Sequence, residues 1–567
     1  MAQPALHDTD ILFLNLDMGK TLTGIEHSAL ARASLFIDEL GVHPLIVTFQ
    51  YRPELQRNVA ALLGSERYHS ATRIKGLYDC LQGFDDPALP VSELKGTLPP
   101  ATDPSFIGYT PAPVEGHKDV RYLNGQGRLF AYKVYSKEHG ELIHINYFEK
   151  GQKVAADIYH TTGHRSSHRL YDPNSRQRTH EIFYSPWGTP LFFRVFEREG
   201  TESSPEERLA PGFYLHASLT TGQSFSQPTH ASFESTATGL RAIDHILGQC
   251  TFLGDSTDFS LYALNALTTR LKSERLWLLN DKNKFTFKAS ALLRDTPVGA
   301  NREKQIRVFG ALHSTHFQGK ELDTKLKTHY RDLLEGHDAP NGVVALTQVQ
   351  TRDVKRRFPD QNVVTVPHTL SASYKALKSA DGEGPPSQRD KIVYVARLSP
   401  EKQHLKALEI LAEVVKHAPQ VCLHLYGEGG ERDKIKARIE ALGLERHVVL
   451  EGYCNDIASI YRDAQCAILT SVMEGFPLTL LEAMAFRCPV VAFDVRYGPS
   501  DMIVSDETGF LVAPNDTTAF AEHLTRLVVE PGLARRLGDH ARARFKTHFS
   551  PSSVAKRWEE TIMESFR

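Results

Sequence analysis

The sequence predicts an α/β protein in which two doubly wound, Rossmann-like domains face a cleft, with a β-rich antiparallel hairpin insertion in the first domain. Two regions in which apolar strands alternate with helical runs predict the domains, and a regular spacing of tyrosines between them predicts the insertion. With 567 residues, 41% of them hydrophobic and 24% charged, the chain has the composition of an ordinary soluble protein with several cores.

The first domain begins with an apolar strand at 11–16, a loop that contains Gly19 and Gly24, and a helical run over 26–40. Further apolar strands are expected at 44–49, 275–280, 306–313, 342–347 and 362–368. A strand, loop, helix and strand in this order are typical of a parallel α/β layer. We therefore expect an N-terminal Rossmann-like domain in two parts, 1–75 and 236–378.

The insertion is expected over 76–235, with a β-meander core at about 120–198. Tyrosines recur there at a spacing of 12 or 13, and several are followed four residues later by Gly or Ser. The tyrosines are Tyr122, Tyr135, Tyr147, Tyr159, Tyr171 and Tyr184, and the turn residues are Gly151, Gly163, Ser175 and Gly188. Strand, turn and strand at this period indicate antiparallel hairpins. The histidines of HTTGHRSSH, 160–168, are expected on the surface of this region.

The second domain follows a Gly-, Pro- and Ser-rich linker at 379–390 and is expected over 391–545, with a C-terminal helix at 546–567. Its strands are expected at 391–398, 421–427, 447–453, 466–471 and 489–495, with helical stretches between them. Strands that alternate with helices predict a mainly parallel sheet with right-handed crossovers. In such sheets ligands bind beyond the carboxyl ends of the strands.

Several charged residues fall at those carboxyl ends. Arg397 and Lys402 follow the first strand of the second domain, Glu428 follows the next, and Glu474 and Glu482 follow the strand at 466–471. Each of these alone would be an ordinary surface charge. Together on one rim of one sheet they indicate a site for a charged ligand.

The stretch SVMEGFPLTLLEAMA, 471–485, predicts an anion site. A helix that starts near Leu478 leaves its first N–H groups unpaired and carries partial positive charge, and Gly475 lets the backbone approach a ligand. Arg397 and Lys402 could clamp a diphosphate there, and Glu482 could take the hydroxyls of a ribose. Glu474, before the turn, would face a more distal group such as a sugar.

These motifs resemble glycosyltransferase family 4, whose members have the GT-B fold. The motifs are EGFPLTLLE (474–482), ARLSPEKQ (396–403), YGEG (426–429) and GY (452–453). Within that family, VVAFDVRYGPSDMI (490–503), LTGIEHSALARASLF (22–36) and the tyrosine-rich insertion are similar to wall teichoic acid α-glycosyltransferases of the poly(glycerol-phosphate) α-glucosyltransferase type. The α-N-acetylglucosaminyltransferases of Ser/Thr-rich adhesins are close relatives of these enzymes.

The resemblance implies a site for a UDP-sugar, either UDP-glucose or UDP-N-acetylglucosamine. It assigns the diphosphate to the two cations, the ribose to Glu482 and the donor sugar to Glu474. The residues that it implies are Gly24, His313 (with His316 as a weaker candidate beside it), Arg397, Lys402, Glu428, Tyr453, Glu474, Gly475, Phe476, Leu478, Thr479 and Glu482. Pro477 is a departure, because many members have glycine there, and Gly24 stands alone in a loop that is often Gly-Gly.

The implied reaction is transfer with retention of configuration, in which cations and the helix start stabilise the leaving UDP. Same-face attack is favoured over double displacement, because Glu474 is placed at sugar hydroxyls rather than beneath the anomeric carbon. His313 is expected to bind rather than to act as a base. Glu474, His313, Arg397 and Lys402 are thus the expected catalytic group, and no metal or other cofactor is expected.

The expected acceptor is a polyol-phosphate polymer, and the alternatives are a Ser/Thr-rich secreted adhesin or, in a different class, a role as a non-catalytic glycosyltransferase-like chaperone subunit. A net charge of −2 gives no general attraction to nucleic acid. Six scattered cysteines, no signal peptide and no apolar run of roughly 18 residues favour the cytoplasm, with peripheral contact to the inner membrane surface compatible. A homo-oligomer through the insertion is expected, and KRRF (355–358) and the arginines of the insertion are candidates to track a phosphate polymer.

Overall fold

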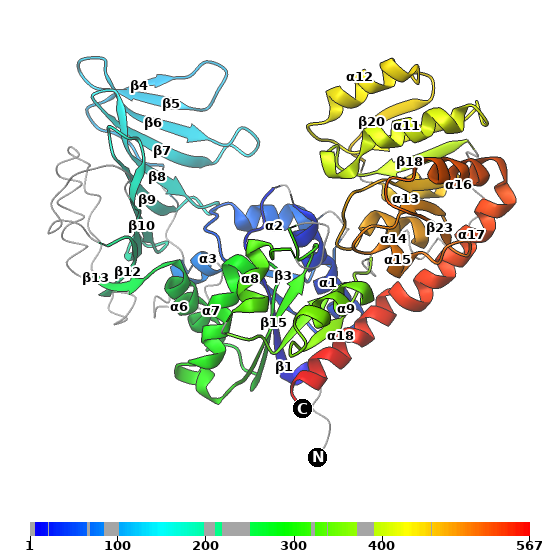
Figure 1. The fold of residues 1–567 in the computed structure, drawn as a ribbon. Coiled ribbons are helices and arrows are strands. Elements are labelled where there is room, and N and C mark those ends of the chain that lie inside the picture. Colours follow the sequence, from blue (N-terminus) through cyan, green and yellow to red (C-terminus); the bar gives the residue numbers. More distant parts are fainter. Residues whose placement is uncertain are drawn as a thin grey trace.

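The structure is a computed structural model that describes residues 6–20, 22–64, 68–83, 101, 103–197, 210–217, 250–318, 324–336, 338–370, 390–454 and 456–567. It contains two parallel sheets flanked by helices and one antiparallel sheet (Figure 1). The antiparallel sheet and the C-terminal domain rise on opposite sides of the N-terminal domain, as both views show. The fold class predicted from the sequence is confirmed.

The N-terminal domain is built on a seven-stranded parallel sheet in the order β17-β16-β15-β14-β1-β2-β3. Its strands are β1 Thr9–Asn15, β2 Leu45–Thr48, β3 Arg73–Gly76, β14 Arg275–Asn280, β15 Gln305–Leu312, β16 Gly342–Ala345 and β17 Val363–Thr365. The central strands β1 and β14 pair in parallel along six positions although 259 residues, 16–274, lie between them in the chain. Strands buried on both faces read as near-continuous apolar runs, which is why RLWLLN was recognisable from the sequence.

Helices cover both faces of this sheet. They are α1 Gly24–Leu40, α2 Leu55–Leu63, α3 Leu77–Gln82, α6 Ser256–Thr268, α7 Asn283–Asp295, α8 Thr328–Glu335 and α9 Gln348–Arg357, with short 3₁₀ turns at Leu6–Asp8 and Gly299–Glu303. Helix α1 starts with a capping box between Thr23 and Glu26 and ends at Gly41, whose φ of 64° is the left-handed conformation that glycine favours.

The insertion is a ten-stranded antiparallel sheet in the order β13-β12-β11-β10-β9-β8-β7-β6-β5-β4. Its strands are β4 Thr110–Pro113, β5 Val120–Leu123, β6 Leu129–Tyr135, β7 Leu142–Glu149, β8 Gln152–Tyr159, β9 Arg165–Tyr171, β10 Arg178–Tyr184, β11 Pro190–Val195, β12 Gly212–His216 and β13 Cys250–Gly254. Four strands end on a tyrosine of the predicted series, at Tyr135, Tyr159, Tyr171 and Tyr184. The outermost strands, β4 and β13, lie outside 120–198, so the sheet extends beyond the predicted core in both directions.

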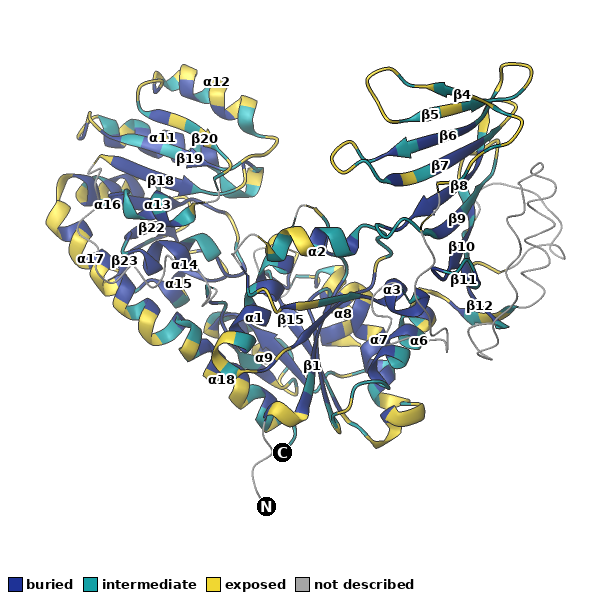
Figure 2. Cartoon of the chain, turned by 180° about the vertical axis from the view of Figure 1, so that it is seen from behind, coloured by how far each residue is buried: buried dark blue, intermediate teal, exposed yellow. Residues whose placement is uncertain are grey.

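The C-terminal domain has a six-stranded parallel sheet in the order β20-β19-β18-β21-β22-β23. Its strands are β18 Lys391–Val395, β19 Cys422–Tyr426, β20 Val448–Gly452, β21 Cys466–Leu469, β22 Val490–Phe493 and β23 Gly509–Val512. Its helices are α11 His404–Val415, α12 Arg432–Leu442, α13 Ile457–Arg462, α14 Leu478–Ala485, α15 Pro499–Met502, α16 Thr517–Val529 and α17 Pro531–Arg544, with a 3₁₀ turn at Pro400–Lys402 and a π turn at Phe545–Phe549. In Figure 2 the inner strands β18 and β22 are buried, while the edge strand β20 is partly exposed and α12 and α17 expose their outer faces. The predicted linker, 379–390, lies outside the described residues except for Asp390.

The last helix, α18 Pro551–Ser565, crosses back from the C-terminal domain and packs on the N-terminal one (Figure 1). Its buried Trp558 lies 6.0 Å from Phe36 of α1 and 5.9 Å from Trp277 of β14, measured between ring centroids. This aromatic contact fastens the end of the chain to the first domain. Among the described residues, no helix has the length and apolar character that a membrane crossing requires.

Candidate active site

Loops at the carboxyl edge of the C-terminal sheet carry the charges that the sequence singled out. Arg397 and Lys402 follow β18, and Glu474 follows β21, the strand beside it in the sheet. Because adjacent parallel strands end at the same edge, the three side chains share one rim.

The loop after β19 holds the Arg397 loop in place. The Leu398 N–H donates to the Glu428 carbonyl at 2.9 Å. Gly427 has a φ of +137°, and a Cβ on it would lie 2.0 Å from the Ala396 carbonyl oxygen. The first glycine of YGEG is therefore required by the contact between these two loops.

Lys402 and Glu474 already contact each other. The Lys402 ammonium donates to Glu474 Oε1 at 2.6 Å, and the Ser471 hydroxyl donates to the same oxygen at 2.6 Å. Their side chains are 19% and 10% exposed, so the pair is partly shielded from water. Arg397 is 78% exposed and lies 3.1 Å from Glu401. The exposed Arg397 side chain can therefore turn towards a ligand. The Lys402 ammonium would have to divide its hydrogen bonds between the ligand and Glu474.

Helix α14 starts at this rim. It begins at Leu478 after Pro477, whose carbonyl accepts from the Leu480 N–H at 3.0 Å. The N–H groups of Leu478 and Thr479 come before this first helical bond and belong to the helix start, which carries partial positive charge. This is the local geometry that an anion site needs.

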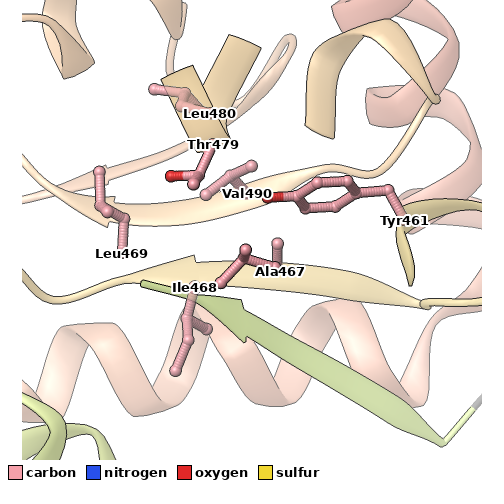
Figure 3. A pocket seen from close by; sticks show the side chains of 8 residues that line it. Tyr461, Ala467, Ile468, Leu469, Thr479, Leu480 and Val490 are labelled. Carbon is pink, nitrogen blue, oxygen red and sulfur yellow. The ribbon is translucent and has the colours of Figure 1, made fainter. Parts of the chain in front are cut away.

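Glu482 lies one turn inside α14 and is only 8% exposed. Burial, with the nearby Glu482 charge, raises the pKa of Tyr461 well above its ordinary value. Tyr461 and Thr479 border a small cavity between the helix start and the sheet (Figure 3). Because Glu482 is mostly buried, a ribose at this position could contact only the small accessible part of the Glu482 surface.

On the facing domain, His313 follows β15 and is held by a buried network. Its Nε2 lies 2.8 Å from Asp281 Oδ1, while Asp281 Oδ2 accepts from Arg32 at 2.5 Å and from the Asn15 amide at 3.0 Å. Burial by itself would raise the pKa of Asp281, but the Arg32 guanidinium and the bond from His313 lower it to about 2. Asp281 is therefore ionised at neutral pH.

The network fixes the tautomer of His313. An ionised carboxylate only accepts hydrogen bonds, so the proton of His313 lies on Nε2. Its Nδ1 is buried and has no hydrogen-bond partner among the described residues. The ring also stacks on His368, with centroids 5.7 Å apart. A ligand hydroxyl could supply the missing partner for Nδ1.

The loop before α1 completes this side. Glu26 bonds to Thr23 and lies 3.3 Å from the Lys282 ammonium; burial opposes ionisation, but these contacts lower the pKa of Glu26 overall. A Cβ built on Gly24 would meet nothing within 4 Å. The protein itself therefore leaves open space over Gly24, as a residue approached by a ligand would require.

The two domains meet at the predicted residues. A Cβ on Gly475 would lie 2.2 Å from the His313 carbonyl oxygen, and Phe476 packs edge-on against His368 with centroids 5.6 Å apart. Glu474 and His313 therefore sit on adjoining loops of different domains. Gly475 was expected to let the backbone approach a ligand, whereas the structure shows that the contact between the domains requires it.

Three predicted residues lie away from this centre. Tyr453 is 65% exposed at the end of β20, and the side chain of Glu428 is also exposed, so both stand at the outer part of the rim. His316 is fully buried between the domains and stacks on Tyr497, with centroids 5.9 Å apart. Burial lowers the pKa of His316 to about 3.

The expectation that the histidines of 160–168 lie on the surface was wrong for two of them. His160 and His168 are buried rather than on the surface, and His168 lies 2.8 Å from buried Asp157. Arg357 of KRRF bonds to the Thr324 carbonyl at 2.7 Å and so serves the fold. Similarly, three insertion arginines lie beside buried carboxylates: Arg165 beside Asp157, and Arg169 and Arg178 beside Glu181.

Four residues around His313 were not predicted from the sequence: Asn15, Arg32, Asp281 and His368. Asp281 could have been found, because it directly follows the buried strand at 275–280 and so lies at a ligand-binding edge. Arg32 carried a weaker signal, as a cation among the apolar residues of the helix after Gly24. Within the described ranges, no group of three or more His, Cys, Asp or Glu side chains is arranged to hold a metal.

Two Rossmann-like domains that meet at the ligand-binding edges of their sheets define the GT-B fold, and the solved structure of an S. aureus TarM mutant in complex with fondaparinux, α-GlcNAc-glycerol and UDP is similar. It matches 98% of this chain and 99% of its own with a TM-score of 0.72, at 21% identity. Residues 378–544 match the family model for glycosyl transferases group 1. This part of the chain, which holds Arg397, Lys402 and α14, is similar to that family.

Two curated relatives share part of the sequence. The poly(ribitol-phosphate) alpha-N-acetylglucosaminyltransferase of Staphylococcus aureus (strain COL) is 32% identical over 256 residues, 45% of this chain and 50% of that protein. The poly(glycerol-phosphate) alpha-glucosyltransferase of Bacillus subtilis (strain 168) is 27% identical over 270 residues, 47% of this chain and 39% of that protein. The matched segments thus span half or less of these relatives.

Proposed function

We propose that this chain is a retaining hexosyltransferase that moves glucose or N-acetylglucosamine from a UDP-sugar to a polyol-phosphate polymer. The observation that carries the proposal is the junction of the two domains. There Lys402, Glu474 and the start of α14 lie on loops of the C-terminal domain. His313, which Asp281 holds in place, lies on the adjoining loop of the N-terminal domain. The group 1 domain and the two polyol-phosphate-specific relatives support the same reading.

In this proposal the diphosphate lies between the start of α14 and the two cations, Arg397 and Lys402. Negative charge grows on UDP as the glycosidic bond breaks, and fixed cations and backbone dipoles are suited to stabilise it. Lys402 leaves Glu474 in part when the diphosphate arrives, which frees Glu474 to accept hydrogen bonds from sugar hydroxyls. The donor-binding set is completed by Gly24, Glu482 and the backbone of Gly475 and Phe476.

Same-face attack fits this arrangement better than double displacement. A double displacement needs a carboxylate beneath the anomeric carbon, and the nearest ionised carboxylate to His313 is Asp281, which is fully buried behind the ring. His313 therefore contributes to donor binding and does not act as a general base. No metal is proposed for the reaction, because the cations and the helix start supply the positive charge.

The acceptor surface lies on the N-terminal domain and the insertion in this proposal, and the protein works in the cytoplasm, at the inner face of the membrane. The six cysteines are all thiols, which suits a reducing compartment. The proposal also includes a homo-oligomer formed through the insertion. A Ser/Thr-rich protein is the alternative acceptor, which experiment must distinguish from the polymer.

The test is UDP release by the purified protein. UDP-glucose, UDP-N-acetylglucosamine and UDP-galactose are each offered with poly(glycerol-phosphate), with poly(ribitol-phosphate) and without acceptor. We expect polymer-dependent release from one donor, unaffected by EDTA and lost in Glu474→Ala and Arg397→Ala. Release with a Ser/Thr-rich peptide but no polymer would redirect the proposal to a protein acceptor. Failure to bind any UDP-sugar would overturn it in favour of a non-catalytic subunit.

A further inference from the structure

A carboxylate of the N-terminal domain joins the two domains next to Glu474. Asp353 lies on α9, and its Oδ2 accepts from the Tyr497 hydroxyl at 2.9 Å and lies 3.2 Å from Arg496 Nε. Tyr497 and Arg496 belong to the C-terminal domain, in the segment between β22 and α15. Asp353 is 12% exposed and Tyr497 is buried, so their hydrogen bond is largely withdrawn from water, whereas the Arg496 side chain is 45% exposed.

The same segment is bonded to the backbone of Glu474. The Glu474 N–H donates to the Arg496 carbonyl at 3.0 Å, and the Tyr497 N–H donates to the Glu474 carbonyl at 2.8 Å. Next along the chain, a Cβ on Gly498 would lie 2.4 Å from Pro477. The segment 496–498 and the loop 474–477 therefore move as one unit.

Further contacts press this unit on the N-terminal domain. The Tyr497 ring is 1% exposed and stacks on His316 at an interplanar angle of 7°. At the other end of α9, the Gln348 N–H donates to Asp501 Oδ1 at 2.6 Å. Helix α9 thus holds the C-terminal domain at two points, on either side of Gly498.

We propose that Asp353 is a positioning residue that latches the segment 496–498 to α9 and so holds Glu474 opposite His313. The proposal rests on the proposed function for its catalytic meaning, but the latch itself is a property of the ligand-free fold. Of the residues in the contact, Asp353 is the one whose single oxygen bonds both Arg496 and Tyr497. Its removal should free the unit that carries Glu474 while leaving every proposed donor-binding side chain in place.

The direct test is hydrogen–deuterium exchange of the ligand-free protein. Asp353→Ala and Tyr497→Phe are compared with wild type and with Asp360→Ala, a control that removes an exposed carboxylate just beyond the end of α9. We expect exchange at the Gln348 amide, which donates to Asp501 across the two domains, to rise by about ten-fold or more in both variants, because the contact that holds the domains together beside it is weakened. Asp353→Asn keeps an acceptor for Tyr497 and should recover most of the protection.

Kinetics distinguish positioning from a general loss of structure. If the latch sets the domain arrangement, donor binding must close a looser pair of domains, and KM for the UDP-sugar rises about ten-fold while kcat changes little. Loss of folded protein would instead lower kcat and leave KM unchanged. Exchange in Asp353→Ala and Tyr497→Phe within two-fold of wild type would overturn the latch, whatever the activity assays show. If exchange in Asp353→Ala also rises throughout β18, that substitution has loosened the C-terminal domain as a whole. The nearly isosteric Tyr497→Phe then serves as the test of the latch.

Discussion

At the scale of single residues, Asp281 links stability to the site. Its pKa in the folded protein is about 2, below the ordinary value of 3.8, because the Arg32 guanidinium and His313 outweigh the effect of burial. A depressed carboxyl pKa stabilises the fold above the unfolded pKa. That contribution is lost as the pH falls from about 4 towards 2.

We therefore expect Asp281→Asn to lower the free energy of unfolding by about 3 kcal/mol at neutral pH, because it leaves Arg32 buried beside a neutral group. Urea unfolding from about pH 6 to about pH 3 measures this difference, which should shrink at the acidic end. Asp360→Asn, at an exposed site, serves as the control. A difference that stays constant with pH would show that Asp281 is not ionised in the fold.

Of the two cations proposed to bind the diphosphate, Lys402 is the one that a contact with Glu474 holds in place. Lys402→Ala should reduce kcat/KM for the UDP-sugar by about 10- to 100-fold, since a charge-assisted bond to the diphosphate contributes roughly 1.5–3 kcal/mol. Steady-state kinetics beside Lys416→Ala, an exposed lysine of the same domain, measure the effect. Equal, small effects of the two substitutions would remove Lys402 from the donor site.

Gly24 tests whether the open space at the start of α1 belongs to the donor. In Gly24→Ala the new methyl group meets no protein atom within 4 Å, so the unfolding midpoint should hardly change. We expect KM for the donor to rise several-fold, because the methyl group occupies the ligand's space. Gly532→Ala, at the start of α17 and also open, is the matched control. Unchanged kinetics in both variants would place the donor elsewhere.

Site residues that lie in a local motif could be predicted from the sequence. Site residues that come together from distant parts of the chain could not. Glu474 and Lys402 lie in recognisable stretches at strand ends, so their positions could be predicted. Asp281 and Arg32 come together across 249 residues of sequence, and neither stretch alone shows the pairing. His316 was misjudged because its motif places it beside His313, while its side chain turns into the domain interface.

At the scale of elements, the open edge of the insertion is protected. Strand β4 contains Pro111 and Pro113, which have no N–H group. Alternate residues of a strand turn their N–H groups to the same side, so two donors are missing from one side of β4. Prolines in strands are tolerated where that side is the open edge. Pairing of two copies along β4 is therefore disfavoured, and an oligomer through the insertion would have to use another surface.

Replacing both prolines tests this reading. Pro111→Thr with Pro113→Thr restores the donors, and we expect the double variant to self-associate at lower concentration than wild type in sedimentation velocity. Ala112→Thr adds β propensity to the same strand without a new N–H group and should behave like wild type. If the double variant also matches wild type, β4 is protected by something other than its prolines.

Most strands could be predicted from the sequence. Apolar runs located most strands of both parallel sheets to within a few residues, since strands buried on both faces need continuous apolar sequence. The tyrosine period located the hairpins because four of the six tyrosines mark a strand end. The outer strands β4, β12 and β13 have no such marker, so the extent of the antiparallel sheet could not be predicted.

At the scale of the whole molecule, function depends on how the two domains meet. Gly475 against the His313 carbonyl, and Asp353 against Tyr497, bring residues of separate sheets into one site. The sequence predicted the two halves but not the interface, because no periodicity encodes a contact between domains. The interface also joins the two halves of the proposed chemistry, since the clamp stands on one domain and the anchored histidine on the other.

The most direct test of the central claim is an NMR spectrum of the polymer after incubation with the protein and the UDP-sugar that supports UDP release. We predict new anomeric signals of the α configuration on the polyol-phosphate chain, the same configuration as in the donor, and none with Glu474→Ala. Signals of the β configuration would contradict retention by same-face attack. UDP released with free sugar and an unmodified polymer would contradict the transfer itself.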